Sequence, residues 1–152
     1  MLPVDSEAKK GVVTGLQLWN WIEKELENAF AKNPSKRFGG WFVRFAGMQV
    51  NFTINNEMNK RVNWVKIGDQ PLDKNREYSI VACEREGDPN DTICRIENVK
   101  TPALLGLKMH EVIEEYLAAH PVVSPALEAR AIATDFESTL LTQLQGTSYQ
   151  FR

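Results

Sequence analysis

The sequence predicts an α+β domain in which mixed layers of antiparallel sheet and helices share one core. Three strand-like runs between residues 48 and 83 are separated by turn-forming residues, an order typical of an antiparallel meander. Amphipathic helical segments lie before and after these runs. With 152 residues, 43% of them hydrophobic and 25% charged, the chain has the size and composition of a single globular domain.

The first predicted element is a helix over residues 16–30. Its apolar side chains fall within a stripe of about 120° on a helical wheel, which predicts one buried face. Thr14 stands where an N-cap belongs, and the pair Asn33 and Pro34 ends the helix, because a residue before proline avoids helical backbone angles. Trp21 falls on the polar side of the wheel, which leaves two interpretations: a half-exposed contact with a neighbouring domain, or a cover for part of the surface.

The strands follow the helix. The second predicted strand alternates apolar and polar side chains, the pattern of a strand with one buried and one wet face. Asparagines at residues 55–59 and the segment Gly68-Asp69-Gln70-Pro71 supply turns between the runs. The expected strands are residues 41–45, 48–54, 61–67 and 78–83.

Arg44 interrupts the otherwise apolar run at residues 41–45. Alternation places it on the same face as Phe42. Two interpretations stay open for Arg44: an exposed strand position, or an anion contact that faces a cleft.

A second helix is expected over residues 108–119. Its apolar residues recur at the spacing of an amphipathic helix, and its acidic residues form a solvated side. Beyond residue 135 a short apolar stripe predicts a third helix, ended by Gly146. We therefore divide the chain into a domain over residues 1–135 and a C-terminal extension over residues 136–152 that forms a short helix.

Charge and hydropathy exclude several classes of function. A net charge of -2 provides no electrostatic basis for binding nucleic acid. No apolar run approaches the ~20 residues that a membrane-spanning helix needs. The first residues lack the basic and apolar regions of a signal peptide, so we expect no export signal in this chain.

Catalytic and metal-binding patterns are also missing from the sequence. The two histidines, His110 and His120, stand ten residues apart in one predicted helix, about 15 Å along its axis, so they cannot share an ion within it. No nucleophile elbow, phosphate-binding loop or dinucleotide motif is present. We expect no catalytic residue, no metal ligand and no cofactor in this chain.

Several segments, in this order, resemble the C-terminal domain of the 5'-nucleotidase family. A threonine and glycine begin the helix, an aromatic and glycine-containing run opens the strands, and a short arginine-containing segment follows the second helix. The resemblance covers roughly residues 2–132. It rests on residues 14–18, 42–48, 61–62, 68–74, 78–82 and 124–132.

The resemblance implies a division of labour. In that family an N-terminal metallophosphoesterase domain holds two divalent metal ions and hydrolyses the phosphoester, and the C-terminal domain grips the substrate. Leu2 and Pro3 resemble a pair in the middle of the family domain, so we expect further residues of the domain upstream. The implied partners are the protein's own N-terminal domain and a small-molecule substrate such as a nucleotide. This chain alone is expected to be inactive, and the parent protein to be periplasmic or extracellular.

The loop after residue 83 decides the expected substrate. In the family a glycine-rich loop ends in an aromatic residue that stacks on the nucleobase. Here Cys94 falls near that aromatic, and Asn90 and Asp91 replace the paired glycines. The substrate-binding residues predicted from the residues and the resemblance are Arg44, Phe42, Asn90, Asp91 and Cys94. Two alternatives to nucleotide recognition stay open: a binding or assembly module without catalysis, and a hydrolase acting on a non-nucleotide substrate, like the related thiosulfohydrolases.

Cys83 and Cys94 are the only cysteines and enclose this loop with ten residues between them. A disulfide between them would stabilise the fold by about 3 kcal/mol in the chain-entropy model. The alternative is a pair of small buried thiols. Export of family members to oxidising compartments favours the bridge.

Overall fold

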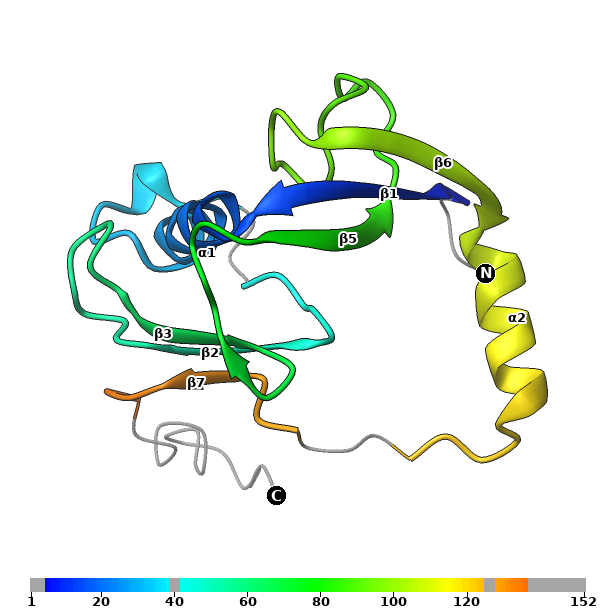
Figure 1. Ribbon diagram of the computed structural model, residues 1–152. Helices are drawn as coiled ribbons and strands as arrows, with labels where there is room; N and C mark the ends of the chain where they lie inside the picture. The colour runs from blue at the N-terminus through cyan, green and yellow to red at the C-terminus, as the bar shows by residue number, and fades with distance from the viewer. Residues whose placement is uncertain (1–4, 39–41, 125–127, 137–152) are drawn as a thin grey trace.

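The computed structural model describes residues 5–38, 42–124 and 128–136, and confirms an α+β fold (Figure 1). The described strands form two sheets, one with strand order β5-β1-β6 and one with order β4-β3-β2-β7. The elements in chain order are β1 (Glu7–Thr14), α1 (Gly15–Phe30), a 3-10 turn (Pro34–Lys36), β2 (Met48–Phe52), β3 (Val62–Ile67), β4 (Gln70–Pro71), β5 (Glu77–Cys83), β6 (Lys100–Lys108), α2 (Met109–Ala119) and β7 (Ala131–Ala133).

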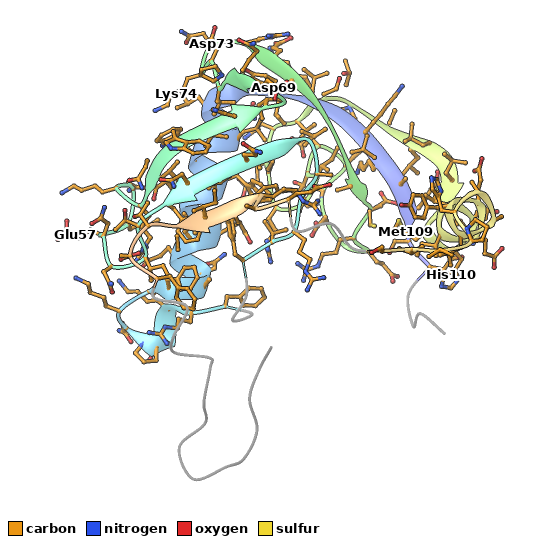
Figure 2. The ribbon with its side chains drawn as sticks, turned by 90° about the horizontal axis from the view of Figure 1, so that it is seen from below. Glu57, Asp69, Asp73, Lys74, Met109 and His110 are labelled. Atoms are coloured by element: carbon orange, nitrogen blue, oxygen red, sulfur yellow. The ribbon has the colours of Figure 1, made fainter. Side chains whose placement is uncertain are left out.

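Helix α1 lies across one face of the four-stranded sheet, as the two views in Figures 1 and 2 show. It continues directly from β1, the central strand of the other sheet, and so connects the two sheets. Ile22 and Leu26 of α1 and Val50 of β2 have no exposed surface, and they belong to one apolar cluster. The core therefore sits between α1 and the four-stranded sheet.

The predicted limits of the first helix are confirmed. The hydroxyl of Thr14 accepts a hydrogen bond from the backbone N–H of Gln17, whose side-chain oxygen accepts one from the N–H of Thr14 in return. This capping box satisfies two donors that a helix start leaves free. The helix ends at Phe30, three residues before Asn33.

The expectation that Trp21 lies on an exposed side of α1 is wrong. Trp21 is 8% exposed, and Glu25 on the same side of the helix is 1% exposed. The loop between β5 and β6 covers this side, and its residue Arg95 forms an ion pair with Glu25. A helical wheel shows how residues are distributed around a helix, but it does not show which sides a distant loop covers.

Two corrections concern the meander. Residues 42–45 form no strand. The ring of Phe42 packs against that of Phe45, with 5.7 Å between their centroids, and against that of Phe52, with 5.6 Å. Residues three apart in an extended strand point to opposite faces, so the contact of Phe42 with Phe45 requires a bent segment. The last predicted strand, at residues 78–83, is observed as β5, and it pairs not with β3 but antiparallel with β1, where Gly11 lies opposite Ile80. Only β2, β3 and β4 follow one another in one sheet.

Glu23 ties α1 to the start of β3. Its buried carboxylate accepts hydrogen bonds from the backbone N–H groups of Val62 at 2.8 Å and of Arg61 at 3.3 Å. The guanidinium of Arg61, itself 1% exposed, pairs with Glu27 and donates to the carbonyl of Ile54 at 3.0 Å. A buried charge is tolerated when such partners surround it.

Helix α2 is observed at Met109–Ala119, close to its predicted limits, but its apolar stripe is not buried. Tyr116 and Leu117 are 53% and 50% exposed. Among the helices in the described ranges, none is long and apolar enough to cross a membrane. The helix predicted beyond residue 135 lies, apart from Phe136, outside the described residues.

Candidate substrate-binding site

A cavity of about 520 Å³ opens between β5, the segment at residues 43–48 and the loop at residues 93–96. This volume falls within the range of about 300–1,000 Å³ that small-molecule sites usually have. The side chains of Trp21, Phe45 and Tyr78 supply aromatic walls. Arg44 and Arg76 also belong to this largely apolar lining.

Strand β5 forms one wall of the cavity. Its side chains alternate, so that Tyr78, Ile80 and Ala82 are partly buried against the core while their neighbours are exposed. All residues from 76 to 82 nevertheless line the cavity. Consecutive side chains of a strand point to opposite faces of the sheet, so a cavity that contacts every one of these residues lies along the edge of the strand. Among the described strands β5 pairs with β1 alone, so its other edge is available to line the cavity.

The opposite wall is a tight hairpin at residues 93–96. Ile93 and Ile96 exchange two backbone hydrogen bonds of 3.0 and 2.9 Å. The two residues between them, Cys94 and Arg95, both have positive φ angles, 50° and 68°. Such two-residue turns favour asparagine and glycine, so Cys94 and Arg95 adopt an uncommon conformation that the surrounding contacts must hold.

Two contacts with α1 hold this hairpin. The indole Nε1 of Trp21 donates a hydrogen bond of 2.8 Å to the carbonyl oxygen of Cys94. The guanidinium of Arg95 pairs with the buried carboxylate of Glu25. The helix therefore fixes the position of the cavity wall.

Cys94 presents a neutral thiol to the cavity. Burial is the main cause that raises its pKa, and the neighbouring guanidinium of Arg95 opposes this effect without cancelling it. Cys83 ends β5 and is exposed, and both cysteines are free thiols in the structure. The disulfide between them stays a prediction.

The two arginines differ in their surroundings. Arg44 is exposed, and within the described part of the chain no hydrogen bond or ion pair engages its guanidinium. Arg76 lies over the ring of Tyr78, 5.5 Å from its centroid, and its backbone carbonyl accepts the N–H of Gly15. Neither guanidinium has a hydrogen bond or an ion pair within the described residues, and Arg44 has no aromatic ring over it either, so Arg44 is available to meet an anionic ligand.

The structure brings together two of the five predicted site residues. Arg44 and Cys94 both line the cavity. Phe42 instead packs against the rings of Phe45 and Phe52. Asn90 and Asp91 are exposed in the loop between β5 and β6, outside the cavity lining. For these three residues a role in binding stays a prediction.

Sequence reasoning misses the aromatic walls. The helical wheel places Trp21 on a surface, and the strand pattern does not distinguish Phe45 and Tyr78 from other strand residues. The three rings are visible in the sequence, but their convergence depends on long-range packing. Among the described residues, no group of three or more His, Cys, Asp or Glu side chains is arranged to hold a metal ion.

Comparison with known proteins defines the class of this chain. Residues 1–84 match the family described as "5'-nucleotidase, C-terminal domain". Because the match covers more than half of the chain, the chain belongs to this family, and the resemblance seen in the sequence is confirmed.

Individual relatives are distant. Protein 5NUC from Lutzomyia longipalpis is 24% identical, over 84% of this chain and 27% of its own length. The solved sulfate thiohydrolase SoxB of Thermus thermophilus, in complex with glycerol, gives a TM-score of 0.65 at 21% identity over 88% of this chain and 23% of its own. A 5'-nucleotidase precursor from Thermus thermophilus gives 0.63 at 19% identity, over 90% and 27%.

Haemophilus influenzae NAD nucleotidase gives a TM-score of 0.64 at 15% identity, over 88% of this chain and 25% of its own. These likenesses show a shared fold. The chain spans about a quarter of the length of the relatives it matches.

Proposed function

We propose that this chain is the substrate-recognition domain of a metal-dependent, 5'-nucleotidase-like phosphoester hydrolase. Hydrolysis would be carried out by an N-terminal metallophosphoesterase domain outside this chain, which would hold two divalent metal ions. The observation that supports this proposal is a cavity with aromatic walls and a free arginine, in a chain that belongs to the 5'-nucleotidase C-terminal domain family. The length of the relatives, about four times what this chain covers, leaves room for such a domain.

The lining suits a substrate with a flat or apolar body and an anionic group. The rings of Phe45 and Tyr78 would contact the body, and the guanidinium of Arg44 would bind the anion. A hydrogen bond to a charged group contributes about 1.5–3 kcal/mol, enough to orient a ligand. The raised pKa of Cys94 keeps its thiol neutral near pH 7, so this wall would not repel an anion.

A nucleotide is the first candidate substrate, because its base and phosphate supply both features. A non-nucleotide phosphoester or sulfur oxyanion is the second. The observation that favours it is Cys94, which lines the cavity at the place where the family resemblance expects a stacking aromatic ring. A thiol has no π face, so one side of a base would lack its stacking partner. For the parent protein we propose a periplasmic or extracellular location, as the family resemblance implies.

A thermal-shift titration tests this proposal. Adenosine, AMP, UMP, phosphate and thiosulfate are each added to the chain, since a ligand that binds only the folded state raises stability by RT ln(1 + [L]/Kd). A shift with AMP and UMP supports nucleotide recognition, and a shift with thiosulfate alone supports the second candidate. No shift with any of the five would favour an assembly module that binds no such ligand.

Two variants locate the binding. Arg44→Gln removes the free guanidinium of the cavity and should reduce the shift with AMP. Arg85→Gln removes an arginine that is also exposed but lies outside the cavity lining, and it should leave the shift unchanged. Equal effects of the two variants would argue against this cavity.

A further inference from the structure

The turn that brings Cys94 to the cavity is held by an ion pair outside the cavity. Among the described residues, the lining of the cavity includes Trp21 and Cys94 but neither Glu25 nor Arg95. The guanidinium of Arg95 pairs with the carboxylate of Glu25, which is 1% exposed. Binding in the cavity can therefore depend on this ion pair although the pair does not touch the ligand.

The backbone of the turn has a conformation that its own residues do not favour. Cys94 and Arg95 are consecutive residues with φ angles of 50° and 68°. In this left-handed region the Cβ atom of a non-glycine residue crowds the following carbonyl oxygen. A conformation of this kind persists only where the surrounding structure holds it. The two residues of the turn thus need contacts from elsewhere in the fold.

Two residues of α1 supply these contacts, one for each residue of the turn. Trp21 donates its indole N–H to the carbonyl oxygen of Cys94 at 2.8 Å, and Glu25 pairs with the side chain of Arg95. Trp21 and Glu25 stand four residues apart, so they lie one above the other on the same side of the helix. The buried side of α1 therefore determines the conformation of both residues in the turn.

Glu25 is the main partner of the Arg95 guanidinium. Arg95 also lies 5.9 Å from the centroid of the Phe38 ring, but Phe38 is 59% exposed, and a cation–π contact at an exposed site is weak. The Nε atom of Arg95 is buried and has no hydrogen-bond partner within the described part of the chain. The dependence is mutual, because a buried carboxylate that loses its cation is left as an unpaired charge.

We propose that Glu25 is a positioning residue of the candidate binding site: through Arg95 it holds the turn in its left-handed conformation and so keeps Cys94 in the cavity wall. This inference deepens the proposed function and rests on it for the ligand. It adds a residue that controls ligand affinity from outside the cavity.

Amide hydrogen exchange tests the hold without any ligand, because exchange reports local opening. The amides of Ile93 and Ile96, which donate to each other's carbonyls, report opening of the turn. Glu25→Gln should speed their exchange about tenfold relative to the amides of β2 and β3. Glu86→Gln, at an exposed carboxylate of the same loop, is the control and should change it by less than about twofold. An equal acceleration in β2 and β3 would mean that Glu25→Gln only lowers overall stability, and would overturn the inference.

Two double variants separate backbone conformation from charge. Glu25→Gln/Arg95→Gly and Glu25→Gln/Arg95→Ala remove the same two charges and differ by one methyl group. Glycine adopts a positive φ without steric cost, whereas alanine does not. The glycine variant should return exchange at Ile93 and Ile96 to within about threefold of the wild type, and the alanine variant should stay about tenfold faster. If the two double variants behave alike, Glu25 does not act by holding the turn.

Titration of the same variants with AMP measures the consequence for binding. Glu25→Gln and Glu25→Gln/Arg95→Ala should raise the Kd for AMP about fivefold, and Glu25→Gln/Arg95→Gly should leave it within about twofold, because a preorganised wall binds more tightly. An unchanged Kd in Glu25→Gln would overturn the inference and leave the proposed function intact. No binding of AMP by the wild type would argue against nucleotide recognition, and the exchange experiment would still decide whether Glu25 holds the wall.

Discussion

The indole Nε1 of Trp21 donates a hydrogen bond of 2.8 Å to the carbonyl oxygen of Cys94, 73 residues away in the chain. Trp21 and Cys94 both line the cavity. Their contact therefore connects the stability of α1 to the shape of the candidate binding site. It also holds Cys94 in a left-handed conformation that a non-glycine residue seldom adopts.

Trp21→Phe should destabilise the domain by about 1–3 kcal/mol, because it keeps most of the buried ring and leaves the Cys94 carbonyl without its donor. Urea unfolding followed by circular dichroism measures the change. Trp64→Phe, at a residue of β3 that is 38% exposed, is the control and should change stability by less than about 0.5 kcal/mol. Equal losses of stability in the two variants would show that the hydrogen bond from Trp21 to Cys94 does not stabilise the domain.

Glu23→Ala should lower the stability of the domain more than Trp21→Phe does. Two buried backbone N–H groups, those of Arg61 and Val62, would lose their acceptor, and each such group costs about 1–3 kcal/mol. We expect the free energy of unfolding to fall by roughly 2–4 kcal/mol. Glu57→Ala, at an exposed carboxylate on the far side of the molecule from α2 (Figure 2), should have almost no effect on the same measurement. A small loss for Glu23→Ala would mean that water replaces the carboxylate.

The sequence predicted single elements better than it predicted their neighbours. The helices were recognised because their periodicity and caps are local properties, as with Thr14. The place of β5 was missed because its partner β1 was not predicted as a strand and lies about seventy residues earlier, and alternation does not identify a partner strand. β7, which pairs parallel with β2, has only three residues and no turn signal of its own.

Only part of the site was predicted, because local sequence patterns do not show which distant residues meet. Arg44 drew attention because a charge interrupts an apolar run, and Cys94 because it replaces an expected aromatic residue. Both line the cavity. Phe45 and Tyr78 could not be singled out, since an aromatic residue near a strand is ordinarily part of the core. Only the long-range packing of α1, β5 and the hairpin brings these rings to one place.

The two thiols should differ in reactivity. Burial raises the pKa of Cys94, so less of it is thiolate at a given pH, while Cys83 is exposed. Iodoacetamide at pH 8 should therefore label Cys83 several times faster than Cys94, as peptide mass spectrometry can measure. The variant Cys83→Ser should leave the slow rate at Cys94 unchanged. If neither thiol is labelled until a reductant is added, the predicted disulfide forms instead.

Asp135 should make stability depend on acid. Partial loss of solvent raises its pKa, but the backbone N–H groups of Asn55 and Ile54 donate to its carboxylate, at 2.9 and 2.8 Å, and the net pKa is lowered. A lowered pKa in the folded state contributes stability above the unfolded pKa of about 3.9, and this contribution is lost as pH falls through the folded pKa.

The stability difference between the wild type and Asp135→Asn should therefore be larger at pH 6 than at pH 3, by urea unfolding at each pH. Asp69→Asn, at an exposed turn, is the control variant for loss of a surface carboxylate. A difference for Asp135→Asn that is independent of pH would contradict the assigned role of its carboxylate.

The chain alone should hydrolyse no nucleotide. AMP incubated with the purified chain and Mg²⁺, Mn²⁺, Zn²⁺ or Co²⁺ should release phosphate only at the rate of a buffer blank, because the proposed hydrolytic centre lies in another domain. Metal-dependent turnover that survives repeated purification, and that Arg44→Gln abolishes, would overturn the proposed division of labour.

The most direct test of the central claim is to map ligand binding on the chain by ¹H–¹⁵N NMR during titration with AMP. The account predicts that amide shifts gather at the cavity, in residues 44–48, 76–82 and 93–96, and that Arg44→Gln weakens them. Shifts confined to another surface, or none at millimolar AMP, would contradict the claim that this cavity recognises the substrate.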